Sequence, residues 1–157
     1  MGTKVKILYV DDEENNLVSF KACFRLKYEV FIAISANVAL DILDKNPDMK
    51  VVITDQRMPE ITGVEFLKIL IEKHPNPIRI MLTGFANFAD TVDAVNLGKI
   101  FNYLNKPWEE KTLDETIIKA IAKYEEEDFI RKRAEQTEKA ERSANQMEFI
   151  LRQELLS

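Results

Sequence analysis

The sequence predicts an α/β protein: a (βα)5, flavodoxin-like, doubly wound parallel sheet with a long C-terminal helical extension. Five short β-prone runs alternate with segments of helical spacing. Three of the runs are nearly continuous in Val, Ile and Leu, as expected for parallel strands covered on both faces. No Gly-x-Gly-x-x-Gly loop and no Walker-type loop follows any run, which disfavours a dinucleotide-binding fold.

The expected strands are residues 5–10, 28–34, 51–54, 78–82 and 100–104. After each of them, apolar residues recur every three or four positions, which predicts an amphipathic helix. Cys23, the only cysteine, lies on the first of these helices and is expected to be buried as a small apolar residue. The apolar stripes are Leu17, Phe20 and Phe24; Val38, Ile42 and Leu43; Val64, Leu67, Leu70 and Ile71; Ala89, Val92 and Val95; and Leu113, Ile117, Ala120 and Tyr124.

The composition changes after Pro107: all four glycines and all five prolines lie at or before that residue, and none follows it. We therefore expect a compact domain over residues 1–124 and a helical linker over residues 125–157. In the linker, acidic residues repeatedly precede basic residues by four positions, which favours a helix. A thin stripe of Ala140, Ala144, Met147 and Leu151 leaves two possibilities open: a dimeric coiled coil, or a monomeric or disordered extension.

The composition excludes several classes of function. One cysteine and one histidine among 157 residues exclude an internal disulfide and most catalytic triads, and make a Cys/His zinc site untenable. A net charge of −5 argues against a chain that binds nucleic acid directly. No run is long enough for a membrane span, and no targeting segment is recognised, so a cytoplasmic setting is expected.

Chemistry-bearing residues follow the predicted strands at their carboxyl ends. Asp11 and Asp12 follow the first strand, Asp55 the third, Thr83 the fourth and Lys106 the fifth. Because these strand ends meet at one rim of an open parallel sheet, we expect the five side chains to converge. Three close carboxylates without His or Cys favour a hard divalent cation, and a carboxylate beside a cation and a lysine suits phosphoryl transfer.

The residues that follow the strands form recognisable motifs. These are Ile-Leu-Tyr-Val-Asp-Asp-Glu at 7–13, Asp-Gln-Arg-Met-Pro at 55–59 with Gly63, Leu-Thr-Gly at 82–84, and Tyr-Leu-Asn-Lys-Pro at 103–107. Over about residues 4–124 the chain resembles the response-regulator receiver domain of two-component signal transduction. The resemblance implies a phosphoacceptor signalling domain that catalyses only its own phosphorylation and dephosphorylation, rather than an enzyme with a free substrate.

The resemblance also assigns the acidic residues. Asp55 would accept a phosphoryl group from a phosphohistidine on a sensor histidine kinase or a phosphotransfer protein. The cofactor would be Mg²⁺, with Mn²⁺ as an alternative. Asp12 would bind it directly and Asp11 mainly through water, together with Asp55 and the backbone carbonyl of Arg57.

Three further residues receive roles from the resemblance. Lys106 would pair with Asp55 before transfer and with the phosphoryl group afterwards. Thr83 would bond the phosphoryl group and draw its loop inward. Tyr103 would then turn from an exposed to a buried position. We also hypothesise that bulky Arg57 and Phe85 flank the site and slow hydrolysis of the phosphorylated side chain.

The output remains open at this stage. We expect the C-terminal helix to carry the signal to an output module that is missing from this chain or supplied in trans, and it could also form a homodimer. One alternative is a Mg²⁺-dependent aspartate-nucleophile phosphatase of the haloacid-dehalogenase type. That family places a second acid two residues after its nucleophile, where this chain has Arg57. The other alternative is a helical scaffold that works without phosphorylation.

Overall fold

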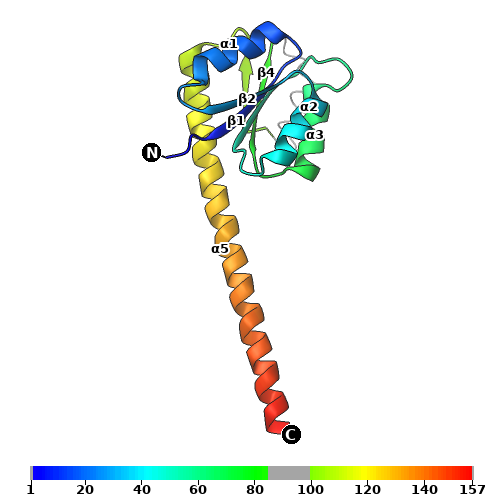
Figure 1. Ribbon diagram of the computed structural model, residues 1–157, viewed down its shortest axis with the longest axis vertical. Coiled ribbons are helices and arrows are strands. Elements are labelled where there is room, and N and C mark those ends of the chain that lie inside the picture. The colour runs from blue at the N-terminus through cyan, green and yellow to red at the C-terminus, as the bar shows by residue number, and fades with distance from the viewer. Residues whose placement is uncertain (1, 85–99, 157) are drawn as a thin grey trace. The chain divides into compact units, whose positions relative to one another are not determined.

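A computed structural model describes residues 2–84 and 100–156, which form two compact units, Met1–Tyr124 and Glu125–Ser157. In the first unit, five parallel strands form one sheet in the order β2-β1-β3-β4-β5 (Figure 1). This order is the flavodoxin-like one, so the predicted fold class is confirmed. The strands are β1 (Lys6–Val10), β2 (Glu29–Ala33), β3 (Val51–Asp55), β4 (Ile78–Thr83) and β5 (Asn102–Asn105); the helices are α1 (Glu14–Phe24), α2 (Ala36–Lys45), α3 (Gly63–Lys73) and α5 (Glu110–Leu156).

The predicted strands agree with the observed ones within two residues. The largest difference is at β5, which begins at Asn102 instead of Ile100. Phe101, which helped to mark the run as a strand, is 39% exposed, whereas the strand itself starts and ends with asparagine. β5 is an edge strand, and an edge strand tolerates polar residues that a central strand would exclude. The run of apolar residues therefore did not predict the first residue of β5 correctly.

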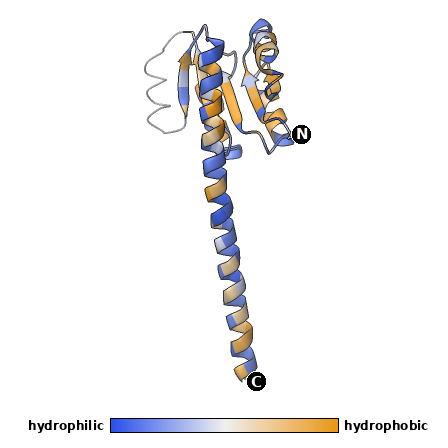
Figure 2. Ribbon diagram, turned by 90° about the vertical axis from the view of Figure 1, so that its left-hand side faces the viewer, coloured by the Kyte–Doolittle hydropathy of each residue, from blue (hydrophilic) through white to orange (hydrophobic). Residues whose placement is uncertain are grey.

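The sheet is covered on both faces, as the apolar strand runs predicted. Successive residues of a strand point to opposite faces. Ile7 and Tyr9 of β1 therefore pack in a core with α1 and the first part of α5, while Leu8 and Val10 pack in a second core with α2 and α3. Figure 2 shows the inner strands of this unit mostly in orange, the hydrophobic end of its scale. Asp11, directly after β1, lies on the α1 side of the sheet, because its carboxylate accepts hydrogen bonds from Tyr9 and from Asn16 of α1.

Two predictions about helix faces were wrong. In α2, Leu43 is buried and Ile42 is partly buried, as expected, but Val38 is 40% exposed, and the other buried residues are Ala36 and Ala39. The Ser35 side chain caps this helix by accepting a hydrogen bond from the Val38 N–H, and a helix that starts there turns its alanines toward the sheet.

Cys23 is exposed although it was expected to be buried. The buried stripe of α1 is Leu17, Phe20 and Phe24, and neighbouring helix positions are about 100° apart, so Cys23 lies beside that stripe. The expected helix that carries Ala89, Val92 and Val95 lies outside the described residues.

The second unit consists of the later part of α5, which is polar and exposed. Acidic and basic residues four positions apart form ion pairs as expected, among them Asp128 with Lys132, Glu138 with Arg142 and Glu148 with Arg152. Large apolar side chains also lie exposed in this unit, including Phe129, Met147 and Leu151. Within the part of the chain that the structure describes, no helix is both long enough and apolar enough to span a membrane.

Gly63 closes the loop between β3 and α3. Its N–H donates to the carbonyl oxygen of Gln56 at 3.0 Å, and the Gln56 side chain accepts from the Val64 N–H at 2.9 Å. A Cβ at position 63 would lie 2.4 Å from the carbonyl oxygen of Asp55 and 2.9 Å from Cα of Gln56. Only glycine fits here, and the tight loop fixes the backbone at the end of β3.

We predict that Gly63→Ala lowers the free energy of unfolding by about 1–3 kcal/mol, because the added methyl group must displace backbone atoms. Gly84→Ala is the matched control, since no described atom lies within 4 Å of the position of its Cβ. Its effect should stay within about 0.5 kcal/mol. Urea unfolding followed by circular dichroism measures both, and equal losses in the two variants would contradict this account of the loop.

Candidate functional site

The carboxyl ends of β1 and β3 bring three carboxylates together. Oxygen atoms of Asp11, Asp12 and Asp55 lie within 4.8 Å of one another. Lys106, directly after β5, reaches the same place: its Nζ lies 2.7 Å from Oδ2 of Asp11 and 3.4 Å from Oδ1 of Asp55. Thr83 ends β4 and is buried, and its carbonyl oxygen accepts a hydrogen bond from the Lys106 N–H at 2.8 Å.

Asp11 is fully buried and accepts four hydrogen bonds from the described residues. Its Oδ2 accepts from the Tyr9 hydroxyl at 2.6 Å, from Lys106 at 2.7 Å and from the Asn16 amide at 3.2 Å. Its Oδ1 accepts from the Glu13 N–H at 3.0 Å. Burial by itself raises the pKa of Asp11, but these donors, Lys106 foremost, outweigh it and hold the pKa below its usual value. Asp11 is therefore a stable anion that anchors Lys106.

Asp55 has a different environment. Its Oδ1 accepts from the Gln56 N–H at 2.9 Å, whereas its Oδ2 accepts no hydrogen bond within the described residues. Burial raises the pKa of Asp55, attraction to Lys106 lowers it, repulsion from Asp11 raises it again, and the result lies above the usual value. Asp55 thus combines an available oxygen with a charge that its surroundings only partly compensate.

Lys106 stays charged in this environment. Burial lowers the pKa of its ammonium group. The hydrogen bond and the charge of Asp11, together with Asp55, raise this pKa by more than burial lowers it, so the pKa lies above its usual value. Lys106 thus pairs with two carboxylates, Asp11 and Asp55, and Asp12 adds a third beside them. Asp12 is half-buried and accepts no hydrogen bond from the rest of the described chain, so its oxygens are available. An excess of negative charge on oxygen ligands alone fits a hard divalent cation.

The other predicted site residues lie around this cluster. Arg57 is exposed in the loop after β3, while Met58 of the same loop packs into the core beside α3. Tyr103 is half-buried against that core, and its hydroxyl oxygen is buried without a hydrogen-bond partner among the described residues. Phe85, paired with Arg57 in the hypothesis on hydrolysis, lies outside the described residues.

Three residues that support the site were not predicted from the sequence: Tyr9, Asn16 and Gln56. Tyr9 belongs to an apolar strand run and to the first motif, and neither of them assigns it a role at the site. A usable signal existed, because residues two apart on a strand share a face, so Tyr9 had to point to the same side as Asp11. Asn16 donates to Asp11 from the start of α1, and the Gln56 N–H donates to Asp55 from the loop after β3. These contacts depend on how the helix start and the loop fold back toward the site, which strand and helix periodicity does not predict.

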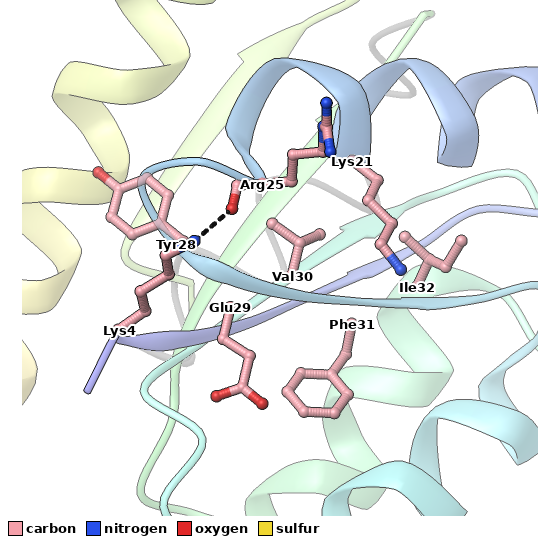
Figure 3. Close-up of a pocket in the computed structure, with 8 residues that line it drawn as sticks. All are labelled: Lys4, Lys21, Arg25, Tyr28, Glu29, Val30, Phe31 and Ile32. Carbon is pink, nitrogen blue, oxygen red and sulfur yellow. Dashed lines mark hydrogen bonds between the residues drawn. The ribbon is translucent and has the colours of Figure 1, made fainter.

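A separate surface pocket of about 520 Å³ lies between α1 and the edge strand β2 (Figure 3). Lys4, Lys21 and Arg25 line it together with Glu29 and apolar residues of β2. The Lys4 ammonium donates to the carbonyl oxygen of Arg25 at 2.9 Å. The pocket contains none of the acidic residues of the cluster, so the rim of the sheet remains the candidate site.

We predict that Asp55→Asn stabilises the protein at pH 7 when no divalent cation is added. Because folding raises the pKa of Asp55, the ionised side chain costs stability above that pKa, and the cost disappears as the pH falls through it. The urea midpoint of the variant should exceed that of the wild type at pH 7, and the difference should shrink toward about pH 4 and on addition of MgCl₂.

Asp48→Asn is the control for this measurement. Asp48 is an exposed partner of Lys6 at 3.0 Å, and this hydrogen bond lowers the pKa of Asp48. Its loss should leave the midpoint unchanged or slightly lower. A lower midpoint for Asp55→Asn than for the wild type would show that the Asp55 charge is not under repulsion.

Comparisons with known proteins place this geometry in a family. A family model described as the response regulator receiver domain matches residues 7–118. The chain is 35% identical over 115 residues to the hydrogenase transcriptional regulatory protein HoxA of Cupriavidus necator, which covers 73% of this chain and 24% of HoxA. It is 34% identical over 109 residues to the transcriptional regulatory protein CpxR of Escherichia coli strain K12, which covers 69% of this chain and 45% of CpxR.

A solved structure agrees with these relatives. The response regulator receiver domain protein from Clostridium thermocellum matches with a TM-score of 0.72 and 32% identity, over 77% of this chain and 97% of that one. The chain thus spans about a quarter of the length of HoxA, but nearly all of a solved receiver domain. The matched residues include the whole sheet and the acidic cluster, and the chain belongs to the response regulator receiver domain family of two-component signalling.

Proposed function

We propose that this receiver domain accepts a phosphoryl group on Asp55 from a phosphohistidine of a sensor histidine kinase or a phosphotransfer protein, with Mg²⁺ or Mn²⁺ as cofactor. The observation that carries the proposal is the cluster itself: three carboxylates within 4.8 Å, and Lys106 Nζ 3.4 Å from Asp55 Oδ1. Phosphoryl transfer requires a positioned nucleophile and positive charge beside the transferred oxygens, and this cluster supplies the first and part of the second.

The reaction begins with Oδ2 of Asp55, the oxygen that accepts no hydrogen bond within the described residues. This oxygen attacks phosphorus, an O–P bond forms, the P–N bond to the donor imidazole breaks, and the imidazole leaves with its electron pair and takes up a proton. The product is an acyl phosphate on Asp55. Attack of water on the same phosphorus returns the carboxylate and releases inorganic phosphate, so the domain acts only on its own side chain.

The two neighbouring aspartates would hold the cation in different ways. Asp12 has available oxygens and would bind it directly. Both oxygens of Asp11 already accept hydrogen bonds, so Asp11 would bind it mainly through water. Asp55 and the backbone carbonyl of Arg57 would complete the set of protein ligands. A bound Mg²⁺ supplies positive charge beside the phosphoryl oxygens.

Lys106 links the reaction to the rest of the domain. Before transfer it pairs with Asp55 at 3.4 Å and also with Asp11 at 2.7 Å. Afterwards it would turn its ammonium group to a phosphoryl oxygen, while the Thr83 hydroxyl would donate to another. The backbone of Lys106 already bonds to that of Thr83. Tyr103 precedes Lys106 by three residues, and its buried hydroxyl lacks a partner among the described residues. We propose that movement at Thr83 changes the packing of Tyr103 and thereby signals phosphorylation.

The second unit, Glu125–Ser157, is proposed as the linker to the output and as a homodimer interface. Phe129, Met147 and Leu151 are among the large apolar side chains that lie exposed on this largely polar helix. Together with Ala140 and Ala144 they lie on one face of the helix. Because the relatives HoxA and CpxR are transcriptional regulators and are longer than this chain, the output module would lie in a further part of a longer protein or act in trans.

Two rival functions are less well supported. An aspartate-nucleophile phosphatase of the haloacid-dehalogenase type needs an acid two residues after the nucleophile, and Arg57 cannot donate a proton there. A scaffold that works without phosphorylation would have no use for repelling carboxylates at the sheet rim. We propose a cytoplasmic setting, where a histidine kinase presents its phosphoryl group, and no direct contact of this chain with nucleic acid.

We predict that acetyl phosphate and MgCl₂ add about 80 Da to the intact protein, the mass of one phosphoryl group. Asp55→Asn should gain no adduct, and chelation of the cation with EDTA should abolish it in the wild type. Asp48→Asn, which alters an exposed carboxylate outside the cluster, should still be modified. Intact-protein mass spectrometry measures all four samples, and an adduct of equal yield on Asp55→Asn would refute the assignment.

We also predict that beryllofluoride with Mg²⁺, a mimic of the phosphoryl group, doubles the solution mass from 18.2 kDa. Ala144→Glu with Leu151→Glu should prevent the doubling, because charges on the apolar face oppose helix pairing. Asn145→Glu with Gln153→Glu adds the same charges to the opposite face and should leave it intact. Light scattering measures the masses, and a mass that never changes would favour the scaffold alternative.

A further inference from the structure

We infer that Tyr9 is a positioning residue of the acidic site: its hydroxyl fixes the Asp11 carboxylate in the orientation that serves the bound divalent cation. The inference deepens the proposed function and depends on it, because the cation is the one proposed to assist phosphorylation of Asp55. It assigns a role to a residue that otherwise belongs to the hydrophobic core. The hydrogen bond from the Tyr9 hydroxyl to Asp11 Oδ2, at 2.6 Å, is the starting observation.

Tyr9 is held rigidly. It has no exposed surface, lies in the central part of the sheet in β1, and pairs in register with Ile32 of β2 and Ile53 of β3. Its ring packs against Phe20 of α1 with the ring centroids 4.5 Å apart. The hydroxyl therefore has little freedom to move away from Asp11, which lies two residues further along on the same side of the sheet.

The other side-chain donors to Asp11 Oδ2 are less constrained. Lys106 reaches it at 2.7 Å through a long side chain that is 20% exposed, and this lysine also faces Asp55 at 3.4 Å. The Asn16 amide is partly exposed, lies at 3.2 Å, and also donates to Glu13 at the same distance. Tyr9 is thus the fully buried side chain that sets the plane of the Asp11 carboxylate, whereas the other two can shift with the state of the site.

The orientation of the Asp11 carboxylate matters for two positive charges at the site, the proposed divalent cation and the ammonium group of Lys106. With Oδ2 bonded to Tyr9 and Lys106 and Oδ1 bonded to the Glu13 N–H, the carboxylate is fixed at both oxygens. Removal of a hydrogen-bond partner of a direct metal ligand typically weakens metal binding by about 10- to 100-fold. Asp11 is proposed to hold the cation mainly through water, so the lower end of that range is expected here. The Tyr9 hydroxyl also shares Asp11 with Lys106, which leaves the lysine more readily available to a phosphoryl group.

The chain offers a close internal control in Tyr28. This residue is also buried, and its hydroxyl also donates to a carboxylate, Oδ1 of Asp114, at 2.8 Å. Asp114 belongs to the first turns of α5 and has no part in the acidic cluster. Tyr9→Phe and Tyr28→Phe therefore each remove one buried hydroxyl and one hydrogen bond to a carboxylate, and only Tyr9→Phe alters the site.

The test is the dissociation constant of Mg²⁺, measured by calorimetric titration of the full chain with MgCl₂. Tyr9→Phe should raise the constant about 10-fold or more, whereas Tyr28→Phe should stay within about twofold of the wild type. Urea midpoints of the two variants should fall by similar amounts. A constant for Tyr9→Phe within twofold of the wild type would overturn the inference, and so would an equal weakening by Tyr28→Phe.

A second measurement uses the wild-type protein and does not depend on how a variant folds. The hydroxyl proton of Tyr9 should give a slowly exchanging NMR signal that shifts when Mg²⁺ is added, while the signal of the Tyr28 hydroxyl should not. An unchanged Tyr9 signal at saturating Mg²⁺ would overturn the inference. Failure of the wild type to bind Mg²⁺ at all would instead contradict the proposed function, so the two failures are distinguishable.

Discussion

The structure of the site depends on one ammonium group shared between two buried carboxylates. Lys106 lies 2.7 Å from Asp11 and 3.4 Å from Asp55, and Asp12 adds a third carboxylate nearby. Like charges in a buried setting repel strongly, and a single lysine compensates them only in part. The remaining deficit of positive charge is what makes the rim suited to a divalent cation, and it gives Lys106 two alternative partners. A group with two partners can report a change in either of them.

The scaffold turns that charge balance into fixed geometry. The site residues come from separate strands and loops, so their spacing is set by strand register and by tight loops rather than by local sequence. Gly63 brings α3 against the end of β3, and Tyr9 anchors Asp11 from inside the core. Phosphorylation can shift the domain between states only by as much as the phosphoryl group interacts differently with each state. A rigid rim with one movable lysine concentrates that difference at Lys106, Thr83 and the residues beside them.

The first turns of α5 are well anchored to the sheet domain. Asp114 accepts hydrogen bonds from Lys27 at 2.6 Å and from Tyr28 at 2.8 Å, and the Trp108 ring packs against Phe20 and Phe24 of α1. The same helix continues into the second unit. Because Trp108 and the start of α5 follow Lys106 within a few residues, the chain connects the acidic site to the proposed linker by a short path. This connection makes the C-terminal helix the natural route for a signal.

The sequence by itself determined the fold class, the order of the elements and the convergence of Asp11, Asp12, Asp55 and Lys106. These follow from residue periodicity and from the rule that parallel strands end at a common rim. For α2 it predicted the burial of Leu43 but wrongly added Val38 and left out Ala36 and Ala39, because the phase of that helix depends on the Ser35 cap and on its fit to the sheet. Only the tertiary structure decided that Tyr9 belongs to the site, because hydrogen bonds require atoms about 3 Å apart, and that proximity arises only when β1 is packed among its neighbours. The pattern of a strand records which side a residue faces, but not the atom that its hydroxyl meets.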